Sequence, residues 1–233
     1  MTLGLSPVYA FMKNASMVDF PGKLAAVFFV SGCNFRCGFC HNAELIEPRA
    51  ERLSWDRLRQ ACGRFRADWA DAAVVTGGEP TIDPGLPGLF DLLKECGFAL
   101  KLDTNGSSPG RLGALLPRLD YVAMDVKCAE DTYPRLTGFD RVDLVRESIR
   151  LIREHARDYE FRTTVIGPVH TDAEMRRIGE MIRGARRFVL QPFVPRGTIP
   201  DAALRATERT TPARMRALKL IMEPYADQVI CRE

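Results

Sequence analysis

The stretch LAAVFFVSGCNFRCGFCHN, residues 24–42, joins an apolar run to three closely spaced cysteines and a histidine. The run 24–30 has the length and the aromatic, β-branched composition of a buried strand. Cys33, Cys37 and Cys40 follow it directly, and they are three of the seven cysteines in the chain. A disulfide, a zinc site, an iron–sulfur cluster and ordinary packing are the alternatives for such a cluster, and other features of the sequence separate them.

The composition is that of a globular protein, with 46% hydrophobic and 27% charged residues. A chain of 233 residues predicts one domain over 1–233. The net charge of +3 is too small to indicate a nucleic-acid partner. No apolar run approaches the roughly 20 residues of a membrane span, and the first residues lack a secretion signal. We therefore expect a cytoplasmic protein with no membrane partner, in which the odd number of cysteines stays reduced.

Short apolar runs alternate with segments of helical periodicity. The expected strands are 24–30, 73–76, 98–102, 120–126, 160–166 and 187–191. This alternation predicts an α/β fold with a mostly parallel sheet and right-handed crossovers. Six strands are too few for a closed eight-stranded barrel, so a partial (β/α)6 barrel or a doubly wound sheet remains. In both, the active site lies beyond the carboxyl ends of the strands.

Apolar residues at helical spacing predict buried stripes between these strands. The stripes are Leu58, Cys62, Phe65 and Trp69, then Val145, Ile149, Ile152 and Ala156, then Met175, Ile178, Ile182 and Ala185. The motif TDAE predicts a capping box, in which Thr171 caps a helix and Glu174 reaches back to it. A last helix over about 211–225 gives a helical extension, about 200–233, after a core of about 9–195.

Polar motifs follow four consecutive expected strands. The cysteines follow the first strand, GGEP (77–80) the second and DTNG (103–106) the third, and the fourth ends in MDVK (124–127). Because the carboxyl ends of parallel strands meet at one edge of the sheet, these motifs should form a single site.

The ligand types distinguish zinc from an iron–sulfur cluster. Three thiolates and His41 match the composition of a zinc site, but adjacent residues such as Cys40 and His41 rarely both reach one ion. Thiolates also hold iron–sulfur clusters. The spacing C-x₃-C-x₂-C lets one loop bind three irons of a [4Fe–4S] cluster and leaves the fourth iron open for chemistry. The other cysteines, which we expect to be packing residues, are Cys62, Cys96, Cys128 and Cys231.

The cysteine motif, with Phe39 before its last cysteine, and GGEP after the next strand together resemble the radical S-adenosylmethionine (SAM) superfamily. The resemblance covers about residues 9–195. It implies a partial barrel of the radical SAM type with one [4Fe–4S] cluster on Cys33, Cys37 and Cys40. It also implies that the open iron binds SAM, and that one electron cleaves SAM to a 5′-deoxyadenosyl radical, which takes hydrogen from a substrate.

The same resemblance assigns the contacts with SAM. Phe39 would lie along the adenine, and Glu79 would sit by the methionine amino group. Gly77 and Gly78 would allow close backbone approach, although a plain strand-to-helix turn also explains two glycines. Lys127 would face the SAM carboxylate; a surface lysine at a strand end is the alternative.

The segments CHNAEL, MVDFPGK, KLDTNGS and MDVK resemble the glycyl-radical-enzyme activases. By that resemblance Asp103 lies near SAM, and Asp103, Thr104 and Asp125 form a possible site for a monovalent cation. A helix or turn cap is the alternative for Asp125. Six motifs, VDFPGK, GCNFRCGFCHN, TGGEPT, DTNG, DVK and QPF, resemble the anaerobic ribonucleoside-triphosphate reductase activating proteins. The best-studied reductase activases are shorter and differ in these strand-end motifs.

The implied partners are a glycyl radical enzyme, which is the protein substrate, and flavodoxin or ferredoxin as the electron donor. The anaerobic reductase is the first expectation, and an enzyme of the pyruvate formate-lyase type is the second. A small-molecule enzyme such as 7-carboxy-7-deazaguanine synthase is a rival, but that family usually has Cys-Asp-Thr where this chain has Cys40, His41 and Asn42. A simple electron-transfer module would not need the motifs that face SAM.

Overall fold

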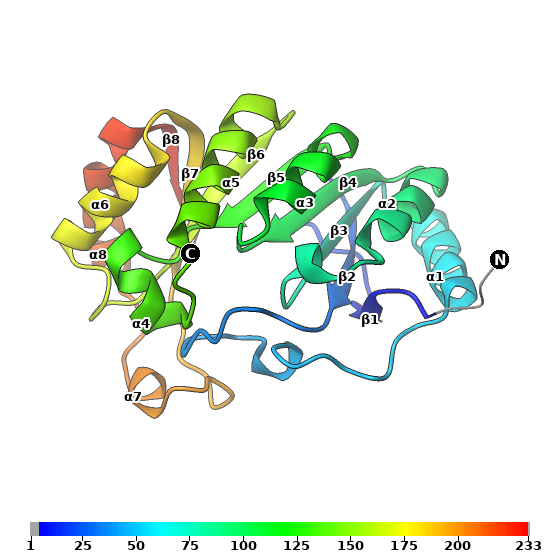
Figure 1. Ribbon diagram of the computed structural model, residues 1–233, viewed down its shortest axis with the longest axis horizontal. Helices are drawn as coiled ribbons and strands as arrows, with labels where there is room; N and C mark the ends of the chain where they lie inside the picture. Colours follow the sequence, from blue (N-terminus) through cyan, green and yellow to red (C-terminus); the bar gives the residue numbers. More distant parts are fainter. Residues whose placement is uncertain (1–4, 233) are drawn as a thin grey trace.

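Eight strands form one sheet in the order in which they occur along the chain (Figure 1). The computed structural model describes residues 5–232. The strands are β1 (Val8–Phe11), β2 (Ala25–Val30), β3 (Ala72–Gly77), β4 (Ala99–Thr104), β5 (Tyr121–Asp125), β6 (Tyr159–Val165), β7 (Ala185–Pro192) and β8 (Ala226–Cys231). Strands β2 to β8 run parallel, and β1 is antiparallel to β2. Within residues 5–232 no pairing joins β8 to β1, so the sheet is an open, partial barrel.

The six expected strands are confirmed as β2 to β7, and two edge strands are added to them. The sequence pattern of β1 is only four residues long. Strand β8 has a single fully buried position, Val229, and exposes Asp227 and Gln228, so it lacks the apolar run of an inner strand. The helical extension expected over about 200–233 contains the expected last helix, at Pro212–Met222, but it also contains β8, which pairs with β7.

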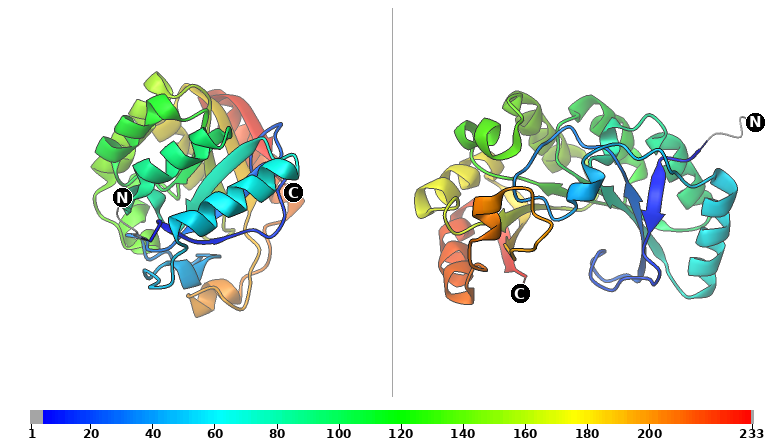
Figure 2. Two further views of the ribbon diagram at one scale, coloured as in Figure 1. Left: turned by 90° about the vertical axis from the view of Figure 1, so that its right-hand side faces the viewer. Right: turned by 90° about the horizontal axis from the view of Figure 1, so that it is seen from below.

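Helices connect the strands and lie mostly along the outer side of the curved sheet, with α7 set apart (Figure 2). They are α1 (Trp55–Ala67), α2 (Leu86–Glu95), α3 (Pro109–Leu115), α4 (Tyr133–Thr137), α5 (Val142–His155), α6 (Asp172–Ile182), α7 (Ala202–Arg205) and α8 (Pro212–Met222). The side chains of Ser54, Thr171 and Thr211 cap α1, α6 and α8. None of the described helices is long and apolar enough to cross a membrane.

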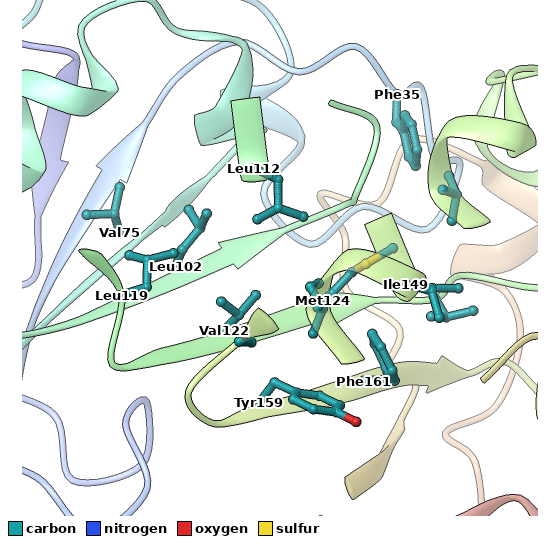
Figure 3. Packing of buried hydrophobic residues seen from close by; sticks show 14 of the residues in the cluster. Phe35, Val75, Leu102, Leu112, Leu119, Val122, Met124, Ile149, Tyr159 and Phe161 are labelled. Atoms are coloured by element: carbon teal, nitrogen blue, oxygen red, sulfur yellow. The ribbon is translucent and has the colours of Figure 1, made fainter. Parts of the chain in front are cut away.

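The two faces of the sheet differ because successive residues of a strand point to opposite sides. On the helix-covered face, Leu102, Met124 and Phe161 are fully buried. They belong to the main hydrophobic cluster together with Leu112 of α3 and Ile149 of α5 (Figure 3). This core fixes the strands, so the alternate positions of the same strands are held rigidly on the other face.

That inner face carries the charged residues. Asp103 of β4, Asp125 of β5 and Arg162 of β6 occupy the positions that alternate with the apolar core residues. A second, small apolar cluster lies on this face, where Phe20 packs on Tyr121 with ring centroids 5.7 Å apart. The core pattern of β4 to β6 therefore places their polar residues on one common surface.

The expected burial of Trp69 is wrong. Helix α1 ends at Ala67, and Trp69 has φ 66° and is 86% exposed. The amide of Trp69 donates to Arg66 O and that of Ala70 donates to Phe65 O, which is the bonding pattern of a left-handed helix cap. The chain must reverse here to begin β3, so the helical spacing of the stripe stops before Trp69.

The capping box of α6 is only half formed. The Thr171 hydroxyl accepts a hydrogen bond from the Glu174 amide at 3.2 Å, as expected. The Glu174 carboxylate does not reach back to Thr171 and instead accepts from the Ala129 amide at 2.7 Å. Glu174 thus ties α6 to the loop after β5, and that long-range contact replaces the local one.

Candidate functional site

A cavity of about 240 Å³ lies at the carboxyl ends of the inner strands. Its lining includes ten of the eleven residues that the sequence singles out, namely Cys33, Cys37, Phe39, Cys40, Gly77, Gly78, Asp103, Thr104, Asp125 and Lys127. The eleventh, Glu79, does not line it. The strand-end motifs are therefore brought together around one cavity.

The cysteine loop, residues 31–42, is held by backbone hydrogen bonds from distant segments. The Cys33 amide donates to Ile46 O at 2.8 Å, and the Arg36 amide donates to Thr137 O at 2.6 Å. Cys37 is buried, and Cys33 and Cys40 are half-buried. The thiols thus reach the cavity from a loop whose course is set by the rest of the fold.

The donor set fits an iron–sulfur cluster better than a single ion. Among the described residues, no three Cys, His, Asp or Glu side chains converge closely enough to hold one metal ion. Three thiols distributed around a shared cavity suit the larger cluster, which is held by thiolates. Burial raises the pKa of Cys33 to about 11 and that of Cys37 to about 12. Binding a cluster would therefore release protons from these thiols.

The two glycines allow β3 to lie against the start of the cysteine loop. Gly77 has φ +126°, and a Cβ there would lie 2.2 Å from Val30 O. A Cβ on Gly78 would lie 2.2 Å from Gly32 O. The Gly78 amide donates to Val30 O at 2.8 Å. The close backbone approach expected of this motif thus exists within the protein, between β3 and the cysteine loop.

Glu79 is fully buried, and its carboxylate accepts hydrogen bonds from neighbouring groups. Its Oε1 accepts from the Thr81 amide at 3.0 Å and from Thr104 Oγ1 at 2.7 Å, and its Oε2 accepts from the Asn105 amide at 2.6 Å. Burial raises the pKa of this carboxyl, and the hydrogen bonds partly oppose the rise. Asn105 in turn donates to Cys33 Sγ at 3.8 Å, so Glu79 connects β4 to the cysteine loop.

A charged wall of five side chains lines or supports the opposite side of the cavity: Lys101, Asp103, Asp125, Lys127 and Arg162. Arg162 bridges the two carboxylates, with Nη1 3.1 Å from Asp103 Oδ2 and Nε 2.8 Å from Asp125 Oδ1. The Lys101 ammonium lies 2.6 Å from Asp103 Oδ1. The Lys127 ammonium lies 2.7 Å from Asp125 Oδ2. Although burial alone would raise the pKa of both carboxyls, these cations hold it below the usual range.

Lys127 is fixed at its backbone as well as at its ammonium. Its amide donates to the Tyr133 hydroxyl at 3.0 Å, and His170 Nε2 lies 2.9 Å from its carbonyl oxygen. The ammonium lies 5.8 Å from the centroid of the Phe39 ring. Burial alone would lower the pKa of Lys127, but Asp125 outweighs it and keeps the side chain charged. These contacts hold Lys127 in place at the cavity, unlike a solvent-exposed lysine at a strand end.

The sequence reading misses Lys101, Arg162 and His170. Arg162 and Lys101 stand inside apolar strands, and a charged residue at an inner-face position of a buried strand is the signal that could have found them. His170 leaves no such signal, because its role depends on a contact 43 residues away in the chain. His41, which the sequence suggests only as a zinc ligand, also lines the cavity, and its Nε2 lies 2.9 Å from Val194 O.

Several proteins are similar to this chain in amino-acid sequence. A Methanocaldococcus jannaschii protein, named as a candidate glycyl-radical enzyme activating enzyme, is 29% identical over 225 residues, covering 93% of this chain and 92% of that protein. The pyruvate formate-lyase-activating enzyme of Streptococcus mutans is 29% identical over 230 residues, covering 88% and 86%. The 7-carboxy-7-deazaguanine synthase of Neisseria meningitidis is 38% identical over 105 residues, covering 45% and 44%.

The fold also resembles that of proteins whose structures have been solved. Streptococcus suis SuiB, bound to its precursor peptide SuiA, superposes with a TM-score of 0.66 at 14% identity, covering 89% of this chain. The chain spans only about half of SuiB, 48%. The model of the radical SAM superfamily matches residues 27–182, which include the cysteine loop, the two glycines and all five residues of the charged wall. The chain belongs to the radical SAM superfamily.

Proposed function

We propose that this protein is a glycyl-radical-enzyme activase, which cleaves SAM and generates a radical on a glycine of a partner enzyme. The observation that carries the proposal is the gathering of the cysteine loop, the glycines and the charged wall around one cavity. The relatives named for glycyl-radical enzyme activation and pyruvate formate-lyase activation match nearly the whole chain. The match to the deazaguanine synthase spans less than half of it.

In this proposal Cys33, Cys37 and Cys40 hold one [4Fe–4S] cluster. The bound cluster supplies the electron that cleaves the carbon–sulfur bond of SAM. The protein's own groups bind and orient SAM and exclude water from it. The Lys127 ammonium faces the SAM carboxylate as a charge-assisted donor, and Phe39, which already lies against that ammonium, packs along the adenine.

Asp103 and Glu79 have different parts in this arrangement. Asp103 lines the cavity and lies near SAM, with its two oxygens paired to Lys101 and Arg162. Glu79 acts chiefly as a positioning residue, because its carboxylate already accepts hydrogen bonds from Thr81, Thr104 and Asn105. A direct contact between Glu79 and the methionine amino group would require this buried carboxylate to become accessible from the cavity, which it does not line.

The partner enzyme would present a peptide loop to the open side of the sheet. A small-molecule substrate usually needs a pocket that buries most of its surface, whereas the described sheet has no strand that closes β8 onto β1. An anaerobic ribonucleoside-triphosphate reductase is the first partner to test and a pyruvate formate-lyase type of enzyme the second. Flavodoxin or ferredoxin would supply the electron.

The test is an anaerobic mixture of the reconstituted protein, SAM, a reductant and each candidate partner, read by electron paramagnetic resonance. We expect a glycyl doublet on the partner. Cys40→Ala should abolish both SAM cleavage and the doublet, and Cys231→Ser, on β8, should retain both. SAM cleavage with no doublet on any glycyl radical enzyme of the host would refute activase function and favour a small-molecule substrate.

A further inference from the structure

Each oxygen of the carboxylates expected to bind a monovalent cation already has a cationic partner in the protein. Lys101 and Arg162 take the two oxygens of Asp103, at 2.6 and 3.1 Å. Arg162 and Lys127 take the two oxygens of Asp125, at 2.8 and 2.7 Å. Each of the four carboxylate oxygens thus has a cationic donor in hydrogen-bonding distance.

Thr104, the third residue expected to bind the cation, also makes hydrogen bonds within the protein. Thr104 Oγ1 donates to Glu79 Oε1 at 2.7 Å and accepts from the Gly106 amide at 3.1 Å. A cation held by Asp103, Thr104 and Asp125 would have to share every ligand atom with a hydrogen-bonding partner that is already in place. The residues present therefore fit a monovalent metal ion poorly.

The balance of charge points the same way. Three cationic side chains surround Asp103 and Asp125, and the nearby carboxylate of Glu160, 4.0 Å from Arg162, has its own partner in Arg232 at 2.8 Å. A further cation would be repelled by these three cationic side chains and attracted in part by the Glu79 carboxylate, which accepts from Thr104 Oγ1 at 2.7 Å. Coulomb repulsion at such distances is strong in a buried site.

Lys101 is the residue best placed to exclude the ion. Its side chain is 2% exposed, and it stands two positions before Asp103 on β4, so both side chains project from the same face. If the Lys101 ammonium moved away from Asp103 to admit an ion, Asp103 would lose one partner. The Lys101 ammonium would then be a buried charge without its counter-ion, which is strongly unfavourable.

We propose that the Lys101 ammonium and the Arg162 guanidinium are the built-in counter-ions of Asp103 and Asp125, so that this protein binds no monovalent metal cation at its SAM pocket. The naming of the pocket rests on the proposed function, but the exclusion of the ion rests only on the contacts of these side chains. SAM binding should accordingly be the same in potassium, sodium and tetramethylammonium chloride at equal ionic strength.

The experiment is equilibrium dialysis of the reconstituted full-length protein against radioactive rubidium or sodium, which reads ion binding without SAM cleavage or a partner. We expect no saturable binding to the unmodified protein. Lys101→Met removes the ammonium and opens Asp103, so it should bind one ion per chain, and Lys101→Arg should restore exclusion. Lys94→Met, which removes an exposed lysine of α2, is the control for lost charge.

Two results would overturn the proposal. One is saturable ion binding by the unmodified protein that Asp103→Asn removes. The other is a folded Lys101→Met protein that binds no ion and whose affinity for SAM is equal in potassium and tetramethylammonium. Neither result depends on finding the partner enzyme. The ion-binding experiment therefore tests this inference independently of the proposed activase function.

Discussion

The cysteine loop and the charged wall face the same cavity but are built by different means. The loop is held by backbone hydrogen bonds and by glycines at which no Cβ fits. The wall is held by side-chain ion pairs that join two half-buried carboxylates to three cations. The first depends on shape and the second on charge, so different substitutions should break each.

The largest effect is expected from Gly77→Ala, which tests the dependence of the loop on shape. A Cβ would meet Val30 O at 2.2 Å, and φ +126° is strained for alanine. The combined clash and strain should lower the free energy of unfolding by about 3–6 kcal/mol. Chemical denaturation measures it, and Gly63→Ala on α1, where nothing lies within 4 Å, should be neutral or stabilising. Equal effects at both positions would contradict the shape argument.

Arg162→Met tests the dependence of the wall on charge. The substitution removes the bridge between Asp103 and Asp125, but each carboxylate keeps one lysine. We expect a loss of about 3 kcal/mol in the free energy of unfolding, at the lower end for a broken buried pair. Arg150→Met, which removes exposed pairs on α5, should cost about 0–1 kcal/mol. An Arg162 effect no larger than the Arg150 effect would show that the bridge is not structural.

Glu79→Gln sharpens the comparison, because Glu79 joins the two regions. The side-chain NH2 of glutamine would replace one carboxylate oxygen. It would then face the backbone N–H of Thr81 or Asn105, so that two donors meet. The expected loss of unfolding free energy is about 2 kcal/mol, with slower cluster reconstitution because Asn105 contacts Cys33. The matched control is Glu208→Gln at an exposed position. Unchanged stability with lost SAM affinity would instead indicate a direct contact with SAM.

The smallest effect concerns pH and His170. Burial lowers the pKa of His170 below its ordinary value of 6.5. As the pH falls, the His170 imidazole is therefore protonated in the unfolded chain before it is protonated in the folded protein. The free energy of unfolding decreases as the pH falls from 6.5 toward the folded-state pKa. We expect a loss of about 1 kcal/mol between about pH 7.5 and 5.5, absent in His170→Gln. The lowered pKa values of Asp103 and Asp125 act only at more acidic pH. The thermal midpoints of both proteins across this range provide the check.

The inner strands and the cysteine site follow from the sequence because each leaves a local signal. Apolar runs mark β2 to β7, and the cysteine spacing marks the loop. Strand β8 is not foreseen, because an edge strand with exposed Asp227 and Gln228 has no apolar run. The pairing of Lys101 and Arg162 with the carboxylates is not foreseen either, because it depends on how β4, β5 and β6 lie side by side. Local patterns thus single out the candidate ligands, while the long-range register of the strands decides which side chains lie beside them.

The backbone bond between Gly38 and Asp201 bears on how the protein is made. The Asp201 amide donates to Gly38 O at 2.9 Å, so the loop that carries the cysteines is completed by a segment more than 160 residues later. During translation the cysteines leave the ribosome early, but their loop gains its final contacts only when most of the chain has followed. The complete cysteine loop therefore forms only after Asp201 has been synthesised, and a nascent chain that stops before Val194 would display the thiols without these contacts.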